Sequence, residues 1–81
     1  MLVTIRLFAR LREIAGGSEL QRELPEGATA HTAWDALVGE FPALADYAKA
    51  VSCAVNEEYA RLATPLKDGD EIAFLPPVSG G

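Results

Sequence analysis

The stretch Thr29-Ala30-His31-Thr32-Ala33-Trp34-Asp35-Ala36-Leu37-Val38-Gly39-Glu40-Phe41 decides the fold of this chain. Its apolar residues recur at the 3.6-residue spacing of a helix and make one stripe, formed by Ala30, Ala33, Trp34, Leu37, Val38 and Phe41. Thr29 can cap the first turn, because its side-chain oxygen accepts from a free backbone N–H. Pro42 disfavours helical geometry at Phe41. We therefore predict a helix that ends near Phe41 and whose stripe, Trp34 included, is the core.

Two strands are predicted before this helix. Residues 2–9 alternate in the period-2 pattern of a strand, with Val3, Ile5, Leu7 and Ala9 on one face and Leu2, Thr4, Arg6 and Phe8 on the other. Residues 10–15 favour one or two helical turns, which Gly16-Gly17 end. Residues 18–24 suit a strand or a helix; we favour a strand, because the segment is short and the turn Pro25-Glu26-Gly27 follows.

Short strands are also predicted after the helix. Residues 43–50 favour a further short turn, and residues 51–55 and 59–63 favour two strands. Lys67-Asp68-Gly69-Asp70 is typical of a turn, and Glu71–Leu75 is the last strand. This order predicts an α+β fold, with one main helix packed across a mixed sheet. Among small folds this order favours the β-grasp roll, in which the first and last strands lie side by side. We predict that residues 1–75 form this domain.

The last strand runs directly into the tail of residues 76–81, Pro76-Pro77-Val78-Ser79-Gly80-Gly81. The two prolines hold the backbone extended, and six extended residues span about 20 Å. The tail then narrows to two residues without side chains and a carboxylate, which ionises near pKa ~3.5 and is a poor electrophile at neutral pH. A frayed terminus is the plain alternative. The prolines and the preceding strand favour a tail that threads into a narrow active site.

Composition limits the partners. The chain has 81 residues, of which 49% are hydrophobic and 23% charged, and its net charge is −5. An acidic balance disfavours nucleic acids and anionic membrane surfaces, but it leaves a basic protein partner open. One cysteine cannot form an internal disulfide, and the apolar run before Arg6 is too short for a signal peptide or a membrane span. We expect a cytoplasmic protein.

No catalytic constellation is predicted inside the domain. His31 has no cysteine or serine nucleophile near it in sequence, and Cys53 alternates as a core thiol does. Asp68, Asp70 and Glu71 lack the ligand spacing of a calcium loop, so we interpret them as a turn and expect no metal. If chemistry happens on this chain, its place is the C-terminus.

Five segments carry a resemblance that runs from end to end of the chain. They are Phe8-Ala9-Arg10-Leu11-Arg12-Glu13, Leu24-Pro25-Glu26-Gly27-Ala28-Thr29, Phe41-Pro42-Ala43-Leu44, Ala54-Val55-Asn56 and, most specifically, Asp68-Gly69-Asp70-Glu71-Ile72-Ala73-Phe74-Leu75-Pro76-Pro77-Val78-Ser79-Gly80-Gly81. With these segments the chain resembles the small, sulfur-carrying subunits of molybdopterin synthase. Where the family often has a second aromatic residue, this chain has Leu75. That difference keeps an apolar contact and removes any contact that needs an aromatic ring.

The resemblance implies a ubiquitin-like β-grasp fold and a specific use of the tail. An activating enzyme would adenylate Gly81 with ATP, and a sulfur donor would convert it to a thiocarboxylate. The tail, including Pro76, Pro77, Val78, Ser79 and Gly80, would thread into the large subunit. Its sulfur would pass to cyclic pyranopterin monophosphate and build the dithiolene of molybdopterin. The expected complex is a heterotetramer with the large subunit, and no cofactor is expected to stay bound to this chain.

Three alternatives stay open at this point. A thiamine-pathway sulfur carrier also ends in Gly-Gly, but it is usually shorter and lacks Pro-Pro-Val-Ser. A ubiquitin-like protein modifier would pass the Gly81 acyl group to a lysine. A non-catalytic β-grasp binding module would leave the tail inert.

Docking residues are also predicted from the alternation. Phe8 falls opposite Val3, Ile5 and Leu7, and Leu75 falls opposite Ile72 and Phe74. If the latter sets face the helix, Phe8 and Leu75 lie on the outer face near the base of the tail, where apolar groups would bind a partner.

Overall fold

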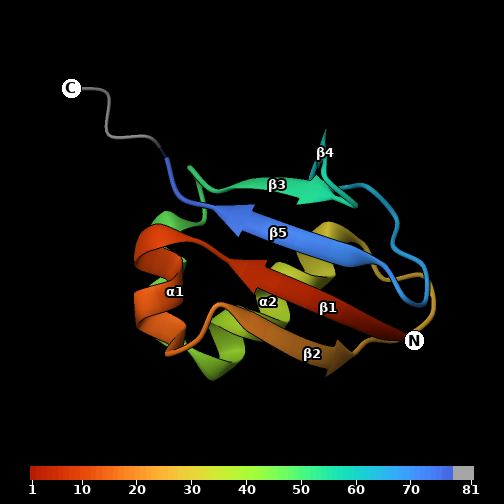
Figure 1. The fold of residues 1–81 in the computed structure, drawn as a ribbon, viewed down its shortest axis with the longest axis horizontal. Coiled ribbons are helices and arrows are strands. Elements are labelled where there is room, and N and C mark those ends of the chain that lie inside the picture. Colours follow the sequence, from red (N-terminus) through yellow and green to blue (C-terminus); the bar gives the residue numbers. More distant parts are fainter. Residues whose placement is uncertain (78–81) are drawn as a thin grey trace.

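Strand β5 (Glu71–Leu75) lies in the middle of a five-stranded sheet. The computed structural model describes residues 1–77, and its sheet has the order β2-β1-β5-β3-β4 (Figure 1). β1 pairs with β5 in parallel, whereas the other neighbours are antiparallel. The other elements are β1 (Leu2–Leu7), α1 (Ala9–Ala15), β2 (Glu19–Glu23), α2 (Ala30–Glu40), the 3-10 helix η1 (Pro42–Tyr47), β3 (Ser52–Val55) and β4 (Glu58–Ala60). The predicted mixed sheet and the pairing of first and last strands are confirmed.

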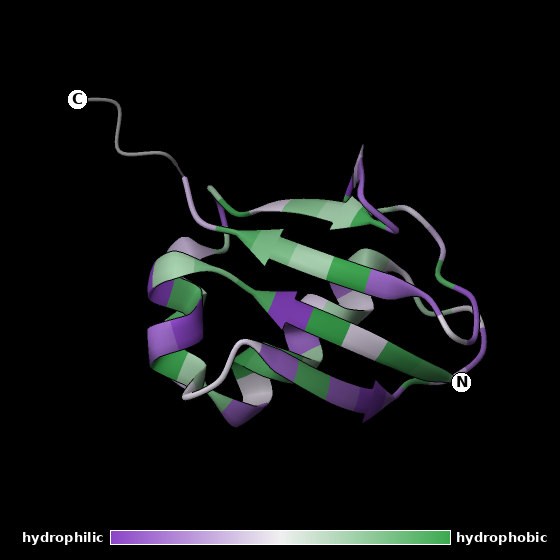
Figure 2. Ribbon diagram, viewed as in Figure 1, coloured by the Kyte–Doolittle hydropathy of each residue, from purple (hydrophilic) through white to green (hydrophobic). Residues whose placement is uncertain are grey.

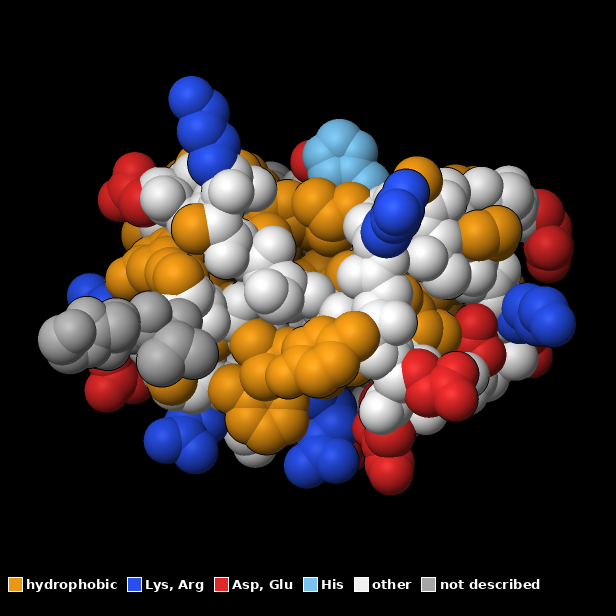
Figure 3. Space-filling model, turned by 90° about the horizontal axis from the view of Figure 1, so that it is seen from above, with side chains coloured by type: hydrophobic (Ala, Val, Ile, Leu, Met, Phe, Trp, Pro, Cys, Tyr) orange, Lys and Arg blue, Asp and Glu red, His pale blue; other side chains and the backbone are white. Residues whose placement is uncertain are grey.

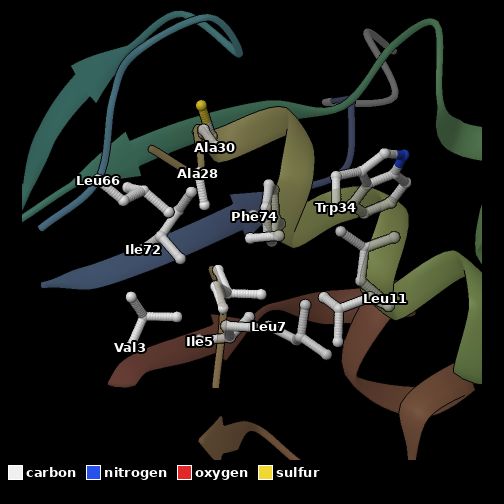
Figure 4. Close-up of a cluster of buried hydrophobic side chains, with 14 of the residues drawn as sticks. Val3, Ile5, Leu7, Leu11, Ala28, Ala30, Trp34, Leu66, Ile72 and Phe74 are labelled. Atoms are coloured by element: carbon white, nitrogen blue, oxygen red, sulfur yellow. The ribbon is translucent and has the colours of Figure 1, made fainter. Parts of the chain in front are cut away.

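The core lies between α2 and one face of the sheet. Every second residue of β1 and of β5 is buried against it. In β1 the residues between the buried ones are polar, whereas β5 is hydrophobic on both faces after its first residue (Figure 2). The ring of Trp34 on α2 packs against Phe74 on β5, with 5.1 Å between ring centroids (Figure 4). The other fully buried large side chains are Val3, Ile5, Leu7, Leu11, Leu37, Leu44 and Ile72. The prediction that the stripe of α2 is the core is confirmed, although Val38 and Phe41 are only half-buried.

Helix α2 begins and ends as its sequence predicts. The side chain of Thr29 accepts a hydrogen bond from the backbone N–H of Thr32, and the hydroxyl of Thr32 accepts one from the backbone N–H of Thr29. The helix ends at Glu40, and the backbone N–H of Phe41 donates to the carbonyl of Leu37. The reciprocal cap satisfies two donors that would otherwise have no partner.

The prediction that β1 extends to Ala9 is wrong. The ladder with β5 stops where Leu7 pairs with Phe74, and Ala9 is exposed at the start of α1 with a φ of 51°. The chain turns there, because the backbone N–H of Leu11 bonds to the carbonyl of Phe8 and the side chain of Leu11 is buried. Burial of Leu11 therefore ends the strand two residues early.

The predicted strand over residues 59–63 is shorter and begins earlier. Asn56 and Glu57, with φ of 50° and 71°, make a tight turn, and β4 occupies Glu58–Ala60. The next residues leave the sheet to serve α2, since the carbonyl of Leu62 accepts from the backbone N–H of His31 at 2.8 Å. The backbone carbonyls of Leu62 and Thr64 thus accept hydrogen bonds from the first turn of α2, whereas in a longer β4 they would face a neighbouring strand.

Candidate functional site

The base of the tail is held in the centre of the sheet. Leu75, the last residue of β5, pairs with Ser52 of β3, and Phe74 beside it pairs with Leu7 of β1. Strands on both sides therefore hold the backbone through Phe74, and β3 alone pairs with Leu75, where the tail begins. Pro76 is half-buried and Pro77 is exposed. Figure 1 shows that the chain leaves the sheet at the end of β5, close to α1.

The predicted threading residues divide between two parts of the chain. Pro76 and Pro77 continue directly from β5, with no hydrogen-bonding N–H to return them to the sheet. Val78, Ser79, Gly80 and Gly81 lie outside the described residues. Their roles therefore stay predictions.

The structure places both predicted docking residues on the outer face of the sheet, opposite α2. Phe8 is 40% exposed and Leu75 is half-buried, and both line one shallow hollow. The guanidinium of Arg6 lies 5.8 Å from the centre of the Phe8 ring and 3.8 Å from the carboxylate of Glu71. An apolar surface with charged groups beside it therefore adjoins the base of the tail.

Tyr59 lines the same hollow, and sequence reasoning missed it as a site residue. It is 84% exposed, the most of any large hydrophobic side chain among residues 1–77. Its exposure follows from register, because the two-residue turn pairs Cys53 with Ala60 and Ala54 with Tyr59. With Cys53 facing the core, Tyr59 has to face outward. Two features of the sequence could have indicated this exposure. They are the prediction that Cys53 faces the core and the position of the turn at Asn56.

Seen from the side of β3, hydrophobic side chains gather into a patch, with basic and acidic side chains next to it (Figure 3). We call the exposed or half-exposed apolar side chains of Phe8, Tyr59 and Leu75 the docking patch. Apolar groups on a surface next to a functional segment are typical of protein interfaces.

The internal candidates for chemistry have structural explanations. Cys53 is buried, its thiol donates to the carbonyl of Ala60 at 3.3 Å, and burial raises the pKa of this thiol. His31 is exposed and contacts the carboxylate of Asp35 at 3.4 Å. Within residues 1–77, burial of Cys53 and the contact of His31 with Asp35 account for both side chains.

The acidic turn before β5 serves the fold. The Asp70 carboxylate accepts from the side-chain amide of Asn56 at 3.0 Å and from the backbone N–H of Lys67 at 2.8 Å. These hydrogen bonds hold the pKa of Asp70 below its usual value. Within residues 1–77 no group of three His, Cys, Asp or Glu side chains is arranged to hold a metal ion. Nor does any helix of that part have the length and apolar character needed to cross a membrane.

Comparison with known proteins places the chain in a family. Residues 5–81 match the ThiS family. The molybdopterin synthase sulfur carrier subunit of Chlamydomonas reinhardtii is 40% identical over 83 residues, a match that covers all of both chains.

Solved structures share the fold. The crystal structure of SAMP1 from Haloferax volcanii has a TM-score of 0.85 at 35% identity, with both chains fully covered. A chain in the complex of subunits 1 and 2 of the molybdopterin-converting factor from Helicobacter pylori has a TM-score of 0.68 at 29% identity, again with both chains fully covered. The β-grasp fold predicted from the sequence is thus confirmed by its ubiquitin-like neighbours. By its sequence match through Gly81 and by its fold, the chain belongs to the ThiS family and is one of the molybdopterin synthase sulfur carrier subunits.

Proposed function

We propose that this chain carries sulfur for the synthesis of molybdopterin, with Gly81 as the residue that holds it. The observation that carries the proposal is the position of the tail. It continues from the central strand, beside an apolar docking patch, in a chain whose family match extends to Gly81. A terminus that is both anchored at its base and narrow at its end is suited to delivering one reactive atom into another protein.

The chemistry follows from the terminal carboxylate. An ionised carboxylate resists attack, so an activating enzyme would join it to the phosphate of AMP from ATP and release pyrophosphate. A donor of sulfur at the oxidation level of sulfide would then form a C–S bond to the carbonyl carbon, the C–O bond to AMP would break, and AMP would leave with the bonding electrons. The product is a thiocarboxylate whose sulfur is a nucleophile toward the pterin precursor, cyclic pyranopterin monophosphate. The sulfur would displace an oxygen substituent from a carbon of this precursor and form a thioester that joins it to Gly81. Water would then attack the thioester carbonyl, and the acyl C–S bond would break with its electrons staying on sulfur. The sulfur would remain on the pterin and the terminus would return to a carboxylate.

The domain itself would supply position rather than catalysis. Cys53 is buried and His31 contacts Asp35 on the surface of α2, and the large subunit would provide the catalytic groups. We propose that Phe8, Tyr59 and Leu75 bind that subunit, in a heterotetramer in the cytoplasm. Support comes from the similar chain of Helicobacter pylori, which is found in a complex of subunits 1 and 2.

The test is to incubate the protein with its activating enzyme, ATP and a sulfur source, and then to measure the intact mass. The mass should change by one sulfur-for-oxygen exchange, located in the C-terminal peptide. Extending the chain by one residue beyond Gly81 turns the reactive group into a peptide bond, so this variant is the control and should gain nothing. An unchanged wild-type mass would refute the proposal.

A protein modifier is the second candidate, because the fold and the sequence are also similar to SAMP1, the small archaeal modifier protein 1 of Haloferax volcanii. In that case the activated Gly81 would be attacked by a lysine amine, and an amide bond to another protein would form. Mass spectrometry of cell extract separates the two functions. Lysine side chains carrying the C-terminal peptide of this chain would favour the modifier, whereas a thiocarboxylate without such conjugates favours the sulfur carrier.

A further inference from the structure

Four side chains form one row across the outer face of the sheet. Arg6 of β1 pairs with Ala73 of β5, Ala73 pairs with Ala54 of β3, and Ala54 pairs with Tyr59 of β4. Side chains at directly paired positions point to the same face of a sheet. Since the two middle residues are alanines and the two end residues are large, the row is low at its centre and high at both ends.

We call the low centre of this row, with its floor of Ala54 and Ala73, the alanine socket. Arg6 and Tyr59 are its side walls, and they stand on strands three spacings apart, about 14 Å. Leu75 and Phe8 line it toward the tail, whereas Glu57 and Glu71 line it at the other end. The socket therefore has an apolar interior and charged residues at its edge, as the centre and rim of protein interfaces have.

We propose that the alanine socket receives one large apolar side chain of the large subunit that encloses the tail. This inference rests on the proposed function and goes beyond it, because it names the feature that selects the partner. The small floor residues determine how deep an incoming side chain can reach. Ala54 and Ala73 would thus determine specificity by leaving space, rather than by making strong contacts themselves.

The identity of the occupant follows from the reach of the tail. Pro77 is the last described residue, and the four residues after it span at most about 14 Å when extended. A protein that encloses Gly81 must therefore lie against the end of the sheet where the tail begins. Leu75, which starts that path, is also a lining residue of the socket. A large subunit that packs around the base of the tail at Leu75 therefore also reaches the socket.

Filling the socket tests the proposal. Ala73→Leu and Ala54→Leu each add a branched side chain where the partner's side chain would enter, on a half-buried outward position. Ala45→Leu makes the same change at an exposed position of η1, outside the socket, and is the matched control. Affinity for the large subunit is measured by calorimetric titration, and folding of each variant is checked by its melting temperature.

We expect each socket variant to raise Kd at least about tenfold, which corresponds to ~1.4 kcal/mol, while Ala45→Leu leaves Kd unchanged. The proposal is overturned if a folded socket variant binds as tightly as wild type. It is also overturned if Ala45→Leu weakens binding as much as they do. If one socket variant does not fold, the other decides. Sulfur loading is measured by mass separately, so a failure of the proposed carrier function is distinguishable from a failure of the socket.

Discussion

Truncation of Phe8 should weaken binding of the large subunit, and the exposed fraction of the Phe8 side chain determines by how much. Complete burial of a phenylalanine side chain stabilises by about 1.5–3 kcal/mol. The domain leaves 40% of Phe8 exposed, so a partner that covers this remainder gains about 0.6–1.2 kcal/mol from it. Phe8→Ala should therefore raise Kd for the large subunit about three- to sevenfold. Calorimetric titration measures the change.

Leu2 offers a matched control for this variant. Leu2 is the first residue of β1, the strand that ends just before Phe8, and it is also 40% exposed, but it lies at the opposite end of β1 from the tail. Leu2→Ala should leave Kd unchanged. Because the fold already covers the rest of Phe8, Phe8→Ala should also lower Tm, and titration is performed well below the melting transition of both variants. An unchanged Kd for Phe8→Ala, or an equal increase for Leu2→Ala, would refute the assignment of the docking patch to the tail end of the sheet.

Three further predictions concern charge, pH and the helix cap. The net charge of −5 should attract basic partners, and salt screens this attraction because it shortens the Debye length to ~3 Å at 1 M. The association rate measured by stopped-flow mixing should therefore fall as salt is added. A rate that does not depend on salt would contradict this prediction. Two hydrogen bonds of 2.6 Å from Arg22 hold the pKa of Glu40 below its usual value. Glu40→Gln should therefore be less stable than wild type in urea at neutral pH, with a difference that disappears as pH falls through the lowered pKa; a difference that persists in acid would count against the ion pair. Thr29→Ala should cost about 1 kcal/mol of stability by thermal melting, whereas Thr29→Ser keeps the acceptor and most of that stability; equal Tm values for both would exclude the cap.

The fold was largely predictable, because its core follows from local patterns. The stripe of α2 and the alternation of β5 specify which faces meet, and Thr29 and Pro42 limit the helix between them. The end of β1 was not predictable from alternation alone. Ala9 continues the pattern, and only the burial of Leu11 in three dimensions turns the chain before it.

The candidate site was predictable in part. The alternation places Phe8 and Leu75 on the outer face, and the structure finds them there. Tyr59 and the alanine socket depend on which residues pair across three strands, and a single strand's pattern does not contain that register. The residues of the row from Arg6 to Tyr59 are far apart in sequence, and only the pairing of the four strands brings them together.

The most direct test of the central claim follows the fate of the sulfur. Protein loaded at Gly81 is mixed with the large subunit and cyclic pyranopterin monophosphate in a single turnover, while intact mass and molybdopterin are both measured. A protein that lacks Gly81 withdraws its terminus by roughly 3.5 Å. Because a 1 Å misplacement can cost on the order of a hundredfold in rate, that protein should form no product. For wild type, the loss of sulfur from the C-terminal peptide should match the gain of dithiolene sulfur. Molybdopterin formation while the sulfur stays on Gly81, or equal activity of the shortened protein, would contradict the account.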